Sequence, residues 1–391
     1  MSFVSSDDSA PRPLAVAMIG GGSGGHLFPA IAVSHRLLQE NSESRILFLV
    51  SQRQIDTTVL ASVGWPNDRV RVEPYITSQS GGRLPGRLSM IPAAWKAMRS
   101  ARRTLADFCP DVAIGVGAFA SVPGVLAASR RRIPIVLMEH NSVPGKATRL
   151  LASRATLTMA GLPLEEQYAA RWPSPLVTTG TPLRDEFSRI AHDARITCRN
   201  RGRLLILGGS QGARSINRLV LQALADEHCL PSDWEIVHQT GETEVQEISH
   251  EYARRGRTAR VVSFLPDMPG ELAQATMAVS RAGACTLHEL SCAGVPSILI
   301  PLSSAAEQHQ MRNSRLIAAV AGAMVLDETD RNAAEQLRSL MADMASQPEL
   351  RQRMSQGIRS LARPDAASRV VSLIRSVADG QVWTRGTASG S

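Results

Sequence analysis

The feature that most constrains the fold is a strand, a glycine-rich loop and a helix that follow one another twice along the chain. The first copy is an apolar run at 14–19 that leads into Gly20-Gly-Gly-Ser-Gly-Gly25 and then into a helical pattern. The second copy is an apolar run at 203–207 that leads into the loop 208–213, again followed by a helical pattern. Backbone N–H groups at the start of a helix can face an anion, so each copy is a potential phosphate site. The repetition predicts two similar α/β domains.

Neither loop matches a nucleotide-binding motif in full. The first fits the dinucleotide pattern G-x-G-x-x-G, but the next apolar strand, at 46–50, is followed by Ser51-Gln52-Arg53 instead of an acidic residue for an adenine ribose. The glycine spacing also imitates a Walker loop, yet His26 and Leu27 replace the required Lys and Ser or Thr. These residues exclude a kinase or ATPase. A nicotinamide oxidoreductase is an alternative that the missing acidic residue and the duplicated loop disfavour.

Short apolar runs alternate with helical patterns through both halves. We expect strands at 14–19, 46–50, 112–116, 133–138, 203–207, 234–238, 259–262, 277–280 and 297–300. Alternation at this spacing is typical of parallel βαβ units in doubly wound sheets, which bind ligands beyond the carboxyl ends of their strands. The prolines within 161–183 indicate an interdomain connection. Two such domains facing each other would place a ligand in the cleft between them.

Composition limits the compartment and the class of partner. The five cysteines form no C-x-x-C pair and no zinc spacing with histidine, so we expect a reducing, cytoplasmic compartment without disulfides or structural zinc. The net charge of +8, carried almost entirely by arginine, permits nucleic acid, anionic lipid or phosphorylated substrates. A basic nucleic-acid-binding protein is therefore the non-enzymatic alternative, although the sequence holds no recognised nucleic-acid motif.

Residues 81–103 combine basic and apolar side chains and contain no acidic residue. One interpretation is an amphipathic helix from about Pro92 that buries Ile91, Trp95 and Met98 and leaves its arginines in solvent. The other is a membrane-surface patch, in which apolar side chains enter the headgroup boundary and each basic residue contributes about 1 kcal/mol of attraction to anionic lipid. The residues assigned to this membrane contact are Arg83, Leu84, Arg87, Leu88, Trp95, Lys96 and Arg99.

The densest polar segment of the second half is 280–296. A strand ends there, a glycine turn follows, and a short helix carries Glu289 before Gly294 and Pro296 end it. A glutamate in a largely apolar helix is costly to bury without partners, so a solvated position is the simpler alternative. At the carboxyl edge of a parallel sheet, however, this carboxylate suits a bidentate hydrogen bond to the two hydroxyls of a ribose. A second polar cluster at 307–313 suits a hydroxyl-rich sugar.

Seven short motifs follow one another along the chain. They are Gly20–His26 with Phe28-Pro29, 139–145, 180–184, 208–214, 281–296, His309-Gln310 with Asn313, and Pro364–Ala367. Their order resembles that of the MurG family, the membrane-associated N-acetylglucosaminyltransferases of peptidoglycan synthesis. The resemblance runs from about 14 to 377, which is nearly the whole chain. It implies an α/β protein of the GT-B fold, with two Rossmann-like, doubly wound domains facing across a cleft.

The resemblance also implies a division of the chain. We expect a disordered leader at 1–12, an N-terminal acceptor- and membrane-binding domain at 13–182, a C-terminal UDP-sugar-binding domain at 183–362, a helix at 363–380 that packs back on the N-terminal domain, and a disordered tail at 381–391.

For activity, the resemblance implies an inverting transfer of N-acetylglucosamine from its UDP donor to the muramoyl 4-hydroxyl of lipid I, which is undecaprenyl-pyrophosphoryl-MurNAc-pentapeptide. Glu289 would hold the ribose hydroxyls, Leu265 the uracil through its backbone, and Ser210 the diphosphate. The other residues expected to bind UDP-N-acetylglucosamine are Ser23, Gly24, Gly25, Asn141, Arg184, Ala284, Cys285, Thr286, Leu287, His288 and Gln310. We expect no cofactor and no metal, and the sequence contains no Asp-x-Asp motif to hold a metal against the diphosphate.

His26 stands where the family has a histidine proposed to act in catalysis. An imidazole, whose ordinary pKa is about 6.5, suits the removal of a proton from the acceptor hydroxyl. The alternative is that His26 only caps its helix or hydrogen-bonds the acceptor. Two departures blur the acceptor site: Met138 stands where the family usually has histidine, and Ala118 stands at a position that is often glycine.

The predicted partners are UDP-N-acetylglucosamine, lipid I and an anionic membrane surface, with no nucleic acid. The predicted location is peripheral, on the cytoplasmic face of the cell inner membrane. The closest alternative is another GT-B transferase that uses a nucleotide sugar on a different acceptor, because it would share Glu289 and the second glycine loop. The residues of the first domain, in 20–29 and 115–145, favour lipid I.

Overall fold

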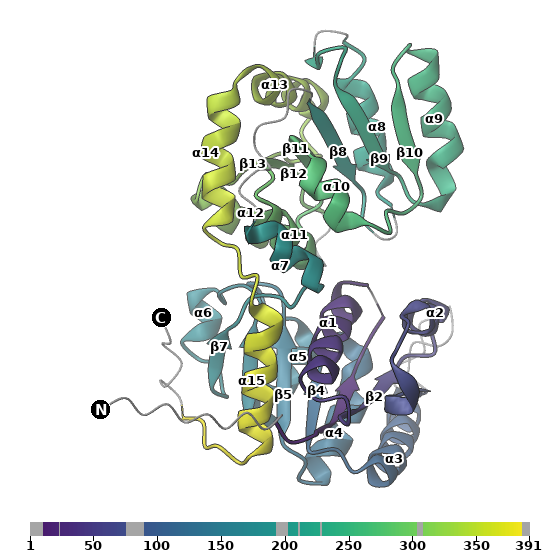
Figure 1. Ribbon diagram of the computed structural model, residues 1–391, viewed down its shortest axis with the longest axis vertical. Helices are drawn as coiled ribbons and strands as arrows, with labels where there is room; N and C mark the ends of the chain where they lie inside the picture. The colour runs from purple at the N-terminus through teal and green to yellow at the C-terminus, as the bar shows by residue number, and fades with distance from the viewer. Residues whose placement is uncertain are drawn as a thin grey trace. The chain divides into compact units, whose positions relative to one another are not determined.

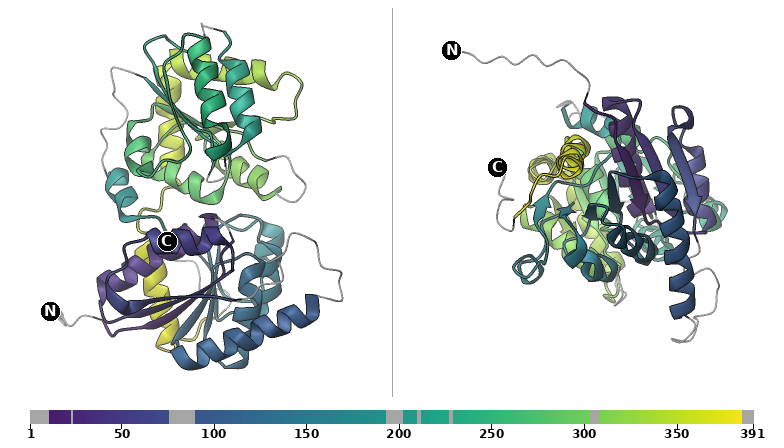
Figure 2. Two further views of the ribbon diagram at one scale, coloured as in Figure 1. Left: turned by 90° about the vertical axis from the view of Figure 1, so that its right-hand side faces the viewer. Right: turned by 90° about the horizontal axis from the view of Figure 1, so that it is seen from below.

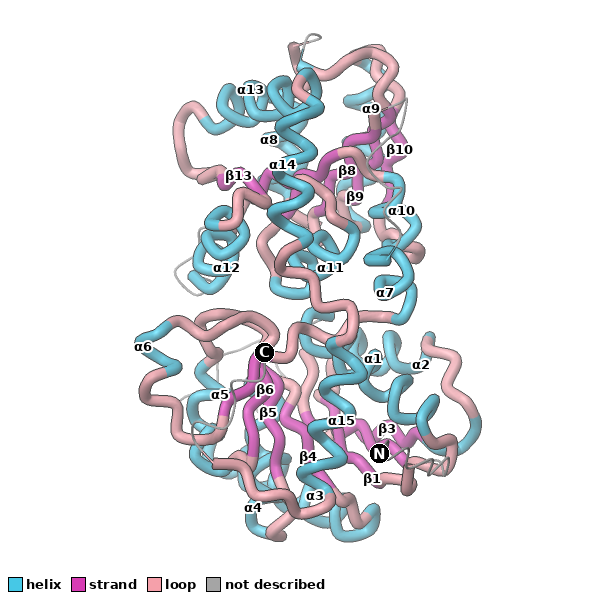
Figure 3. Tube along the Cα trace, turned by 60° about the vertical axis from the view of Figure 1, so that its left-hand side comes forward, coloured by secondary structure: helices cyan, strands magenta, loops and turns pink. Residues whose placement is uncertain are grey.

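The computed structural model describes residues 11–22, 24–75, 90–192, 202–209, 212–226, 229–302 and 308–384. The chain forms two compact units. Unit 1 is Met1–His140, Pro144–Pro182 and Ala366–Ser391, and unit 2 is Asn141–Val143 and Leu183–Asp365. Figures 1 and 2 show each unit as a sheet with helices on both faces, and Figure 3 sets the strands apart in magenta from the cyan helices.

Among the described residues, the sheet of unit 1 has seven strands in the order β3-β2-β1-β4-β5-β6-β7, all parallel. The strands are β1 (Ala15–Ile19), β2 (Arg45–Val50), β3 (Val70–Pro74), β4 (Val112–Gly115), β5 (Ile135–Glu139), β6 (Leu157–Ala160) and β7 (Leu176–Thr178). The strands expected in the first half are confirmed as β1, β2, β4 and β5, while β3, β6 and β7 were not expected. Because β7 lies within 161–183, the interpretation of that stretch as a connection alone is wrong.

Both faces of this sheet are buried, because successive side chains of a strand point to opposite faces. Val16 and Met18 of β1 face one core, which α1 (Gly24–Glu40) and α15 (Ala366–Ala378) cover. Ala17 and Ile19 face the other core, which α3 (Met90–Phe108), α4 (Val122–Arg130) and α5 (Lys146–Leu151) cover. The remaining helices of unit 1 in the described ranges are α2 (Gln54–Ser62), α6 (Glu166–Ala169) and the 3-10 turns η1 (Asn67–Arg69), η2 (Phe119–Ser121) and η3 (Ala152–Arg154).

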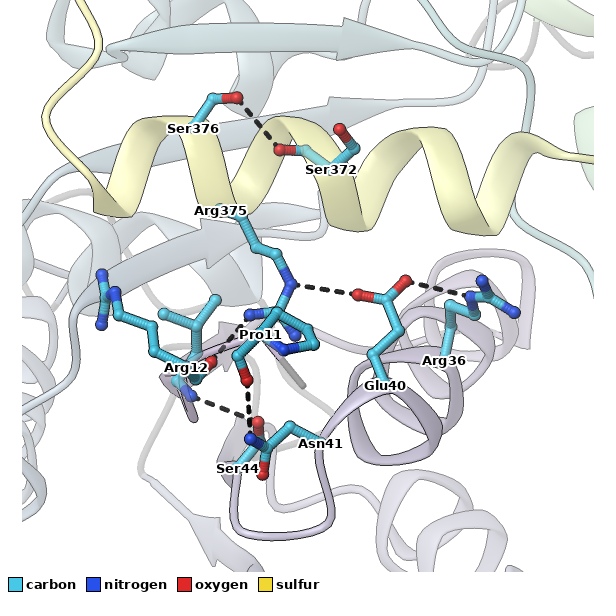
Figure 4. Close-up of polar contacts among 10 residues, drawn as sticks. Pro11, Arg12, Arg36, Glu40, Asn41, Ser44, Ser372, Arg375 and Ser376 are labelled. Carbon is cyan, nitrogen blue, oxygen red and sulfur yellow. Dashed lines mark hydrogen bonds and ion pairs between the residues drawn. The ribbon is translucent and has the colours of Figure 1, made fainter. Parts of the chain in front are cut away.

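Helix α15 belongs to unit 1 through packing and through a partly shielded ion pair. Val370 and Ile374 lie in the same core as the buried face of α1. Arg375 places its Nε 3.0 Å from the Oε2 of Glu40, and its Nη1 donates to the carbonyl oxygen of Arg12 at 2.8 Å (Figure 4). The C-terminal helix is therefore fixed both to α1 and to the segment that leads into β1.

Among the described residues, the sheet of unit 2 has six parallel strands in the order β10-β9-β8-β11-β12-β13. They are β8 (Arg203–Leu207), β9 (Glu235–Gln239), β10 (Ala259–Val262), β11 (Met277–Ser280), β12 (Ser297–Leu299) and β13 (Ala323–Val325). The first five confirm the expected strands of the second half, and β13 was not expected. In both sheets the order reverses at the first strand, between β1 and β4 and between β8 and β11, which is where open α/β sheets bind ligands.

The sheet of unit 2 is also covered on both faces. Leu204 and Ile206 of β8 pack with α8 (Arg214–Ala223), α9 (Val245–Arg254) and α13 (Ala333–Ser346). Leu205 and Leu207 pack on the other face with α7 (Asp185–His192), α10 (Met268–Gln274) and α11 (Ala284–Ala293). Completing this unit in the described ranges are η6 (Glu242–Glu244), α12 (Gln308–Ala319) and α14 (Pro348–Arg359).

Candidate functional site

In unit 1 the loops after β1 and β4 lie side by side. The backbone N–H of Val116 donates to the carbonyl oxygen of Ile19 at 2.9 Å. Gly117 then adopts a φ of +100°, and a Cβ at this position would lie 2.7 Å from the Nδ1 atom of His26. Only glycine combines this backbone conformation with so close an approach. The loop after β4 therefore forms one wall against the imidazole of His26, in the first turn of α1.

A second imidazole lies near the first. The ring centroids of His26 and His140 are 6.1 Å apart, and the rings are tilted by 42°. His140 is buried and directly follows β5. The preceding Glu139 accepts a hydrogen bond from the backbone N–H of Gly145 at 2.9 Å, which ties the end of β5 to the start of α5. The structure thus places His26, Gly24 and Gly25 together at the start of α1, while Ser23 lies outside the described residues.

A carboxylate of α2 that the sequence did not lead us to expect contacts the loop after β1. Asp56 is only 1% exposed, and its two carboxylate oxygens lie 2.8 and 2.9 Å from the backbone nitrogen of Gly22. The hydroxyl of Ser51 donates to the same carboxylate at 2.5 Å. In the dinucleotide pattern an acidic residue is expected at the end of β2, whereas the structure has one in the first turn of the following helix, α2. An aspartate at this place in the sequence is the signal that could have indicated it.

In unit 2, α11 follows β11 beside the point where the strand order reverses, and it carries Glu289. Glu289 is half-buried, and its burial raises the pKa of the carboxyl group to about 7, while the nearby charge of Arg184 acts in the opposite direction. Arg184 also donates to the carbonyl oxygen of Pro266 at 3.3 Å, directly after the buried Leu265. The structure therefore brings together three residues that the sequence analysis assigned to the donor: Arg184, Leu265 and Glu289.

The other residues of the first turns of α11 divide by their exposure. Leu287 is fully buried in the core, and His288 is buried with its Nδ1 donating to the carbonyl oxygen of Ala284 at 2.8 Å. Cys285 and Thr286 are partly exposed, and burial raises the pKa of the Cys285 thiol well above its ordinary value. The side chains of Leu287 and His288 thus support the helix, and only their backbone could face a ligand.

Two amide side chains expected at the sugar have fixed orientations. Asn141 accepts a hydrogen bond at its Oδ1 from the Nδ2 of Asn313 at 2.9 Å, and Gln310 accepts one at its Oε1 from the backbone of Leu302 at 3.1 Å. Asn313 is fully buried, and its own oxygen accepts from the backbone N–H and the hydroxyl of Ser142, both at 3.1 Å. These bonds establish which atom of each amide is oxygen and which is nitrogen. Asn313 belongs to the polar cluster expected at 307–313, but its contacts with Asn141 and Ser142 were not predicted.

The start of α8 is anchored by a buried polar network. Asn217 donates through its Nδ2 to the carbonyl oxygen of Thr240 at 3.2 Å and to Glu244 at 2.7 Å. The Nε2 of His238 lies 3.1 Å from the remaining oxygen of Asn217 and therefore donates to it. Burial lowers the pKa of His238 to about 3, so its ring is neutral near pH 7. The network holds α8 against the end of β9; Ser210 of the adjoining loop lies outside the described residues.

Helix α3 exposes the basic and aromatic residues that the sequence analysis assigned to a membrane. It starts at Met90, and the stripe that packs against the sheet is Ala97, Ala101 and Leu105. Trp95 is 57% exposed, so the interpretation that this helix buries Trp95 is wrong. The small alanines let the helix approach the sheet closely, and Trp95 lies about 200° around the helix from Ala97, away from that stripe.

Next to Trp95 on the exposed side of α3 are Lys96 and Arg99. The guanidinium of Arg99 lies 5.4 Å from the centroid of the Trp95 ring, within the range of a cation–π contact. Arg83, Leu84, Arg87 and Leu88 lie outside the described residues. Within the residues that the structure describes, no helix is long and apolar enough to cross a membrane.

Comparison with known proteins gives matches over most of the chain. Residues 16–160 match the glycosyltransferase family 28 N-terminal domain, and residues 203–370 match the family 28 C-terminal domain. A protein of Syntrophotalea carbinolica is 37% identical over 364 residues, which are 92% of this chain and 98% of that protein. It is named UDP-N-acetylglucosamine--N-acetylmuramyl-(pentapeptide) pyrophosphoryl-undecaprenol N-acetylglucosamine transferase.

Two further matches carry the same assignment. A protein of Desulfotalea psychrophila with the same name is 35% identical and covers 92% of this chain and 96% of its own length. The crystal structure of Acinetobacter baumannii MurG superimposes with a TM-score of 0.73 at 27% sequence identity, over 93% of this chain and 100% of that one.

Proposed function

This chain belongs to the MurG family within glycosyltransferase family 28, and on that premise we propose which of its residues bind the two substrates and carry out the transfer. The protein has the GT-B fold. It is an enzyme that transfers N-acetylglucosamine from UDP-N-acetylglucosamine to lipid I in peptidoglycan synthesis. Family membership decides against an oxidoreductase and against a transferase with an unrelated acceptor.

The donor site that we propose is in unit 2, around Glu289. The observation that carries this assignment is the half-buried carboxyl of Glu289 with the charge of Arg184 close by, at the point where the strand order reverses. A carboxylate at such a point can accept hydrogen bonds from both ribose hydroxyls. The backbone of Leu265 would then face the uracil, and the N–H groups at the start of α8 would face the diphosphate.

For the acceptor we propose that His26 is the general base. It removes the proton from the 4-hydroxyl of the muramoyl sugar while that oxygen forms its bond to the anomeric carbon. The bond from the anomeric carbon to UDP breaks on the opposite face, so the configuration inverts and UDP leaves with the electron pair. Arg184 and the start of α8 stabilise the negative charge that develops on UDP. His26 is supported by the wall at Gly117 and by the nearby ring of His140.

The outward face of α3 is the proposed site of contact with the anionic cytoplasmic surface of the inner membrane. Trp95 offers a ring to the headgroup boundary, and Lys96 and Arg99 offer positive charge beside it. An exposed aromatic residue flanked by basic ones is the composition that binds peripherally to anionic lipid. This location brings the enzyme to an acceptor whose undecaprenyl chain is held in the bilayer.

Transfer of labelled N-acetylglucosamine to a lipid I analogue tests the two role assignments. Glu289→Ala should raise KM for UDP-N-acetylglucosamine with a smaller effect on kcat, because it removes a contact to the ribose. His26→Ala should lower kcat by roughly 10²- to 10⁴-fold with little change in that KM. Glu251→Ala, which removes a carboxylate paired with Arg254 and Arg255 on α9, is the matched control. If UDP-sugar binds but the analogue gains no label, the proposed acceptor is wrong.

A further inference from the structure

The backbone N–H and the carbonyl oxygen of Gly22, in the first glycine loop, are both hydrogen-bonded to side chains near the start of α2. Its N–H points at the carboxylate of Asp56, at 2.8 and 2.9 Å from the two oxygens. Its carbonyl oxygen accepts from the Nη1 of Arg53 at 3.1 Å. Arg53 and Asp56 flank the start of α2, where the backbone N–H of Asp56 donates to the carbonyl oxygen of Arg53 at 3.1 Å. In this kind of fold, the N–H groups of the glycine loop commonly bind a phosphate. In this chain, the N–H of Gly22 is already hydrogen-bonded to a carboxylate of the chain itself.

The carboxylate of Asp56 is surrounded by hydrogen-bond donors. The carboxylate is almost fully excluded from solvent, and it receives hydrogen bonds from Gly22 and from the hydroxyl of Ser51. Its place in the first turn of α2 adds the favourable field of a helix N-terminus. Hydrogen bonds to a buried carboxylate and a helix dipole are the terms that offset the cost of removing such a charge from water.

The loop is also closed sterically around this carboxylate. A Cβ on Gly21 would lie 2.7 Å from the Oδ2 of Asp56, so loop and side chain are in close contact. Helix α1 starts at Gly24, two residues after Gly22, and His26 lies in the first turn of this helix. Asp56 therefore binds the backbone of the chain four residues before His26.

We propose that Asp56 is the built-in anion of the first glycine loop. Its carboxylate accepts the hydrogen bond of the Gly22 N–H, which would otherwise be available to a substrate phosphate. It also fixes the start of α1, so that His26 keeps its position. The two glycine loops would then serve different purposes in this chain: the loop of unit 2 is the one that we assign to the diphosphate, while in the loop of unit 1 the N–H of Gly22 already binds a carboxylate of the chain. Asp56 is a positioning residue, because it acts through the loop and does not touch the reacting atoms. The expected effect on kcat rests on the proposed catalytic role of His26, whereas the assignment of Asp56 as an internal anion does not depend on that role.

Chemical rescue with formate tests the proposal in the full-length protein. Asp56→Ala empties the site, and Asp56→Asn fills it with a neutral group of the same size. We expect both variants to lose about tenfold or more in kcat, with KM for UDP-N-acetylglucosamine within about twofold of wild type. Formate should restore kcat several-fold in Asp56→Ala and leave Asp56→Asn unchanged, because the amide blocks the site. Chloride at equal ionic strength should restore neither variant.

A readout without activity keeps the anion separate from the catalytic assignment. Formate, compared with chloride, should raise the thermal unfolding temperature of Asp56→Ala and not that of wild type or of Asp107→Ala. The last variant removes an exposed carboxylate of unit 1 that pairs with Arg71 at 2.8 Å. Full activity of Asp56→Asn, or an Asp56→Ala variant that formate neither stabilises nor reactivates, would overturn the proposal. Formate stabilisation of Asp56→Ala together with a wild-type enzyme inactive on lipid I would instead refute the proposed function and leave the internal anion standing.

Discussion

Asn313 donates its side-chain amide to the Oδ1 of Asn141 at 2.9 Å, although 172 positions separate the two residues in the chain. The oxygen of the same buried amide accepts two hydrogen bonds from Ser142. Residues 141–143 group with unit 2, while the chain on either side of them groups with unit 1. One side chain on α12 thus fixes both the path of this segment and the direction of the Asn141 amide.

Exchange of the Asn313 amide for a carboxylate tests the direction of the Asn141 amide. Asn313→Asp keeps an acceptor for Ser142, but its ionised carboxylate cannot donate to Asn141, so the Asn141 amide loses its fixed orientation. We expect KM for UDP-N-acetylglucosamine to rise several-fold, together with a loss of thermal stability, because an ionised carboxylate is costly to bury at this position. Asn313→Ala should show the same rise in KM and a stability loss of about 1–3 kcal/mol, because buried groups of Ser142 lose their partner.

Steady-state kinetics and thermal unfolding provide both measurements. Asn332→Ala, which truncates an exposed asparagine in front of α13, is the control for the loss of an amide. A KM for the donor that stays at the wild-type value in Asn313→Asp would show that Asn141 needs no orientation from Asn313.

Replacement of Glu289 by glutamine should stabilise the fold at alkaline pH. Burial raises the pKa of this carboxyl group from 4.5 to about 7, so the folded state binds its proton more tightly than the unfolded state does. The stability that this proton gives is present below about pH 4.5 and is lost as the pH rises through 7. The difference, 7 − 4.5, corresponds to about 3 kcal/mol above pH 7. Glu289→Gln should therefore unfold at a higher temperature than wild type at about pH 8, with a much smaller difference at about pH 5.

Calorimetry at both pH values measures this difference, and titration with UDP measures its functional counterpart. Because the ionised carboxylate accepts the ribose hydroxyls better, the affinity of wild type for UDP should increase as the pH rises from about 6 to about 8. The affinity of Glu289→Gln should be weaker and should lack the increase assigned to this carboxyl group. Equal unfolding temperatures of the two proteins at pH 8 would mean that Glu289 is not desolvated in the folded state.

Local sequence patterns predicted the elements that carry the fold, and they failed where contacts are distant. The strands β1 and β8 were recognisable because each is an apolar run that ends in glycines. The strands β7 and β13 have three residues each and were not predicted, although β12 is equally short and was. Each of the two lies at an edge of its sheet and pairs with one neighbouring strand, β6 or β12, so their formation depends on that partner.

In the candidate site, too, local sequence indicated some residues, while contacts between distant residues were not predicted. Glu289 was predicted from a polar residue in an apolar helix at the edge of a sheet, and that environment is local. Asp56 was missed, and the contacts of Asn313 were not predicted, because they join residues that are 34 and 172 positions apart. Trp95 was assigned either to the buried face of an amphipathic helix or to a membrane contact; it is exposed, and the stripe that faces the sheet is Ala97, Ala101 and Leu105.

Addition of one methyl group at Gly117 should impair catalysis without a change in donor binding. Alanine there is strained at a φ of +100°, and its Cβ would meet the Nδ1 and Cε1 atoms of His26 at 2.7 and 2.8 Å. The imidazole must move, so we expect Gly117→Ala to lower kcat by roughly tenfold to a hundredfold at a nearly constant KM for the donor. Gly64→Ala is the control, because a Cβ at Gly64 meets no atom within 4 Å. An unchanged kcat in Gly117→Ala would mean that the exact place of the His26 ring does not limit the reaction.

Reversal of one charge on α3 should weaken binding to anionic vesicles. Arg99 is exposed and stacks on the ring of Trp95, so Arg99→Glu removes a positive charge and adds a negative one at the proposed membrane contact. At about 1 kcal/mol for each charge, this change should reduce binding to phosphatidylglycerol vesicles by roughly tenfold or more.

Arg254→Glu makes the same change in net charge on the exposed surface of α9, so it separates a local contact from a general attraction. Co-sedimentation at low and high salt measures both variants, and wild-type binding should fall with salt because surface charges are screened. If Arg254→Glu weakened binding as much as Arg99→Glu, net charge would explain the attraction and α3 would lose its assignment.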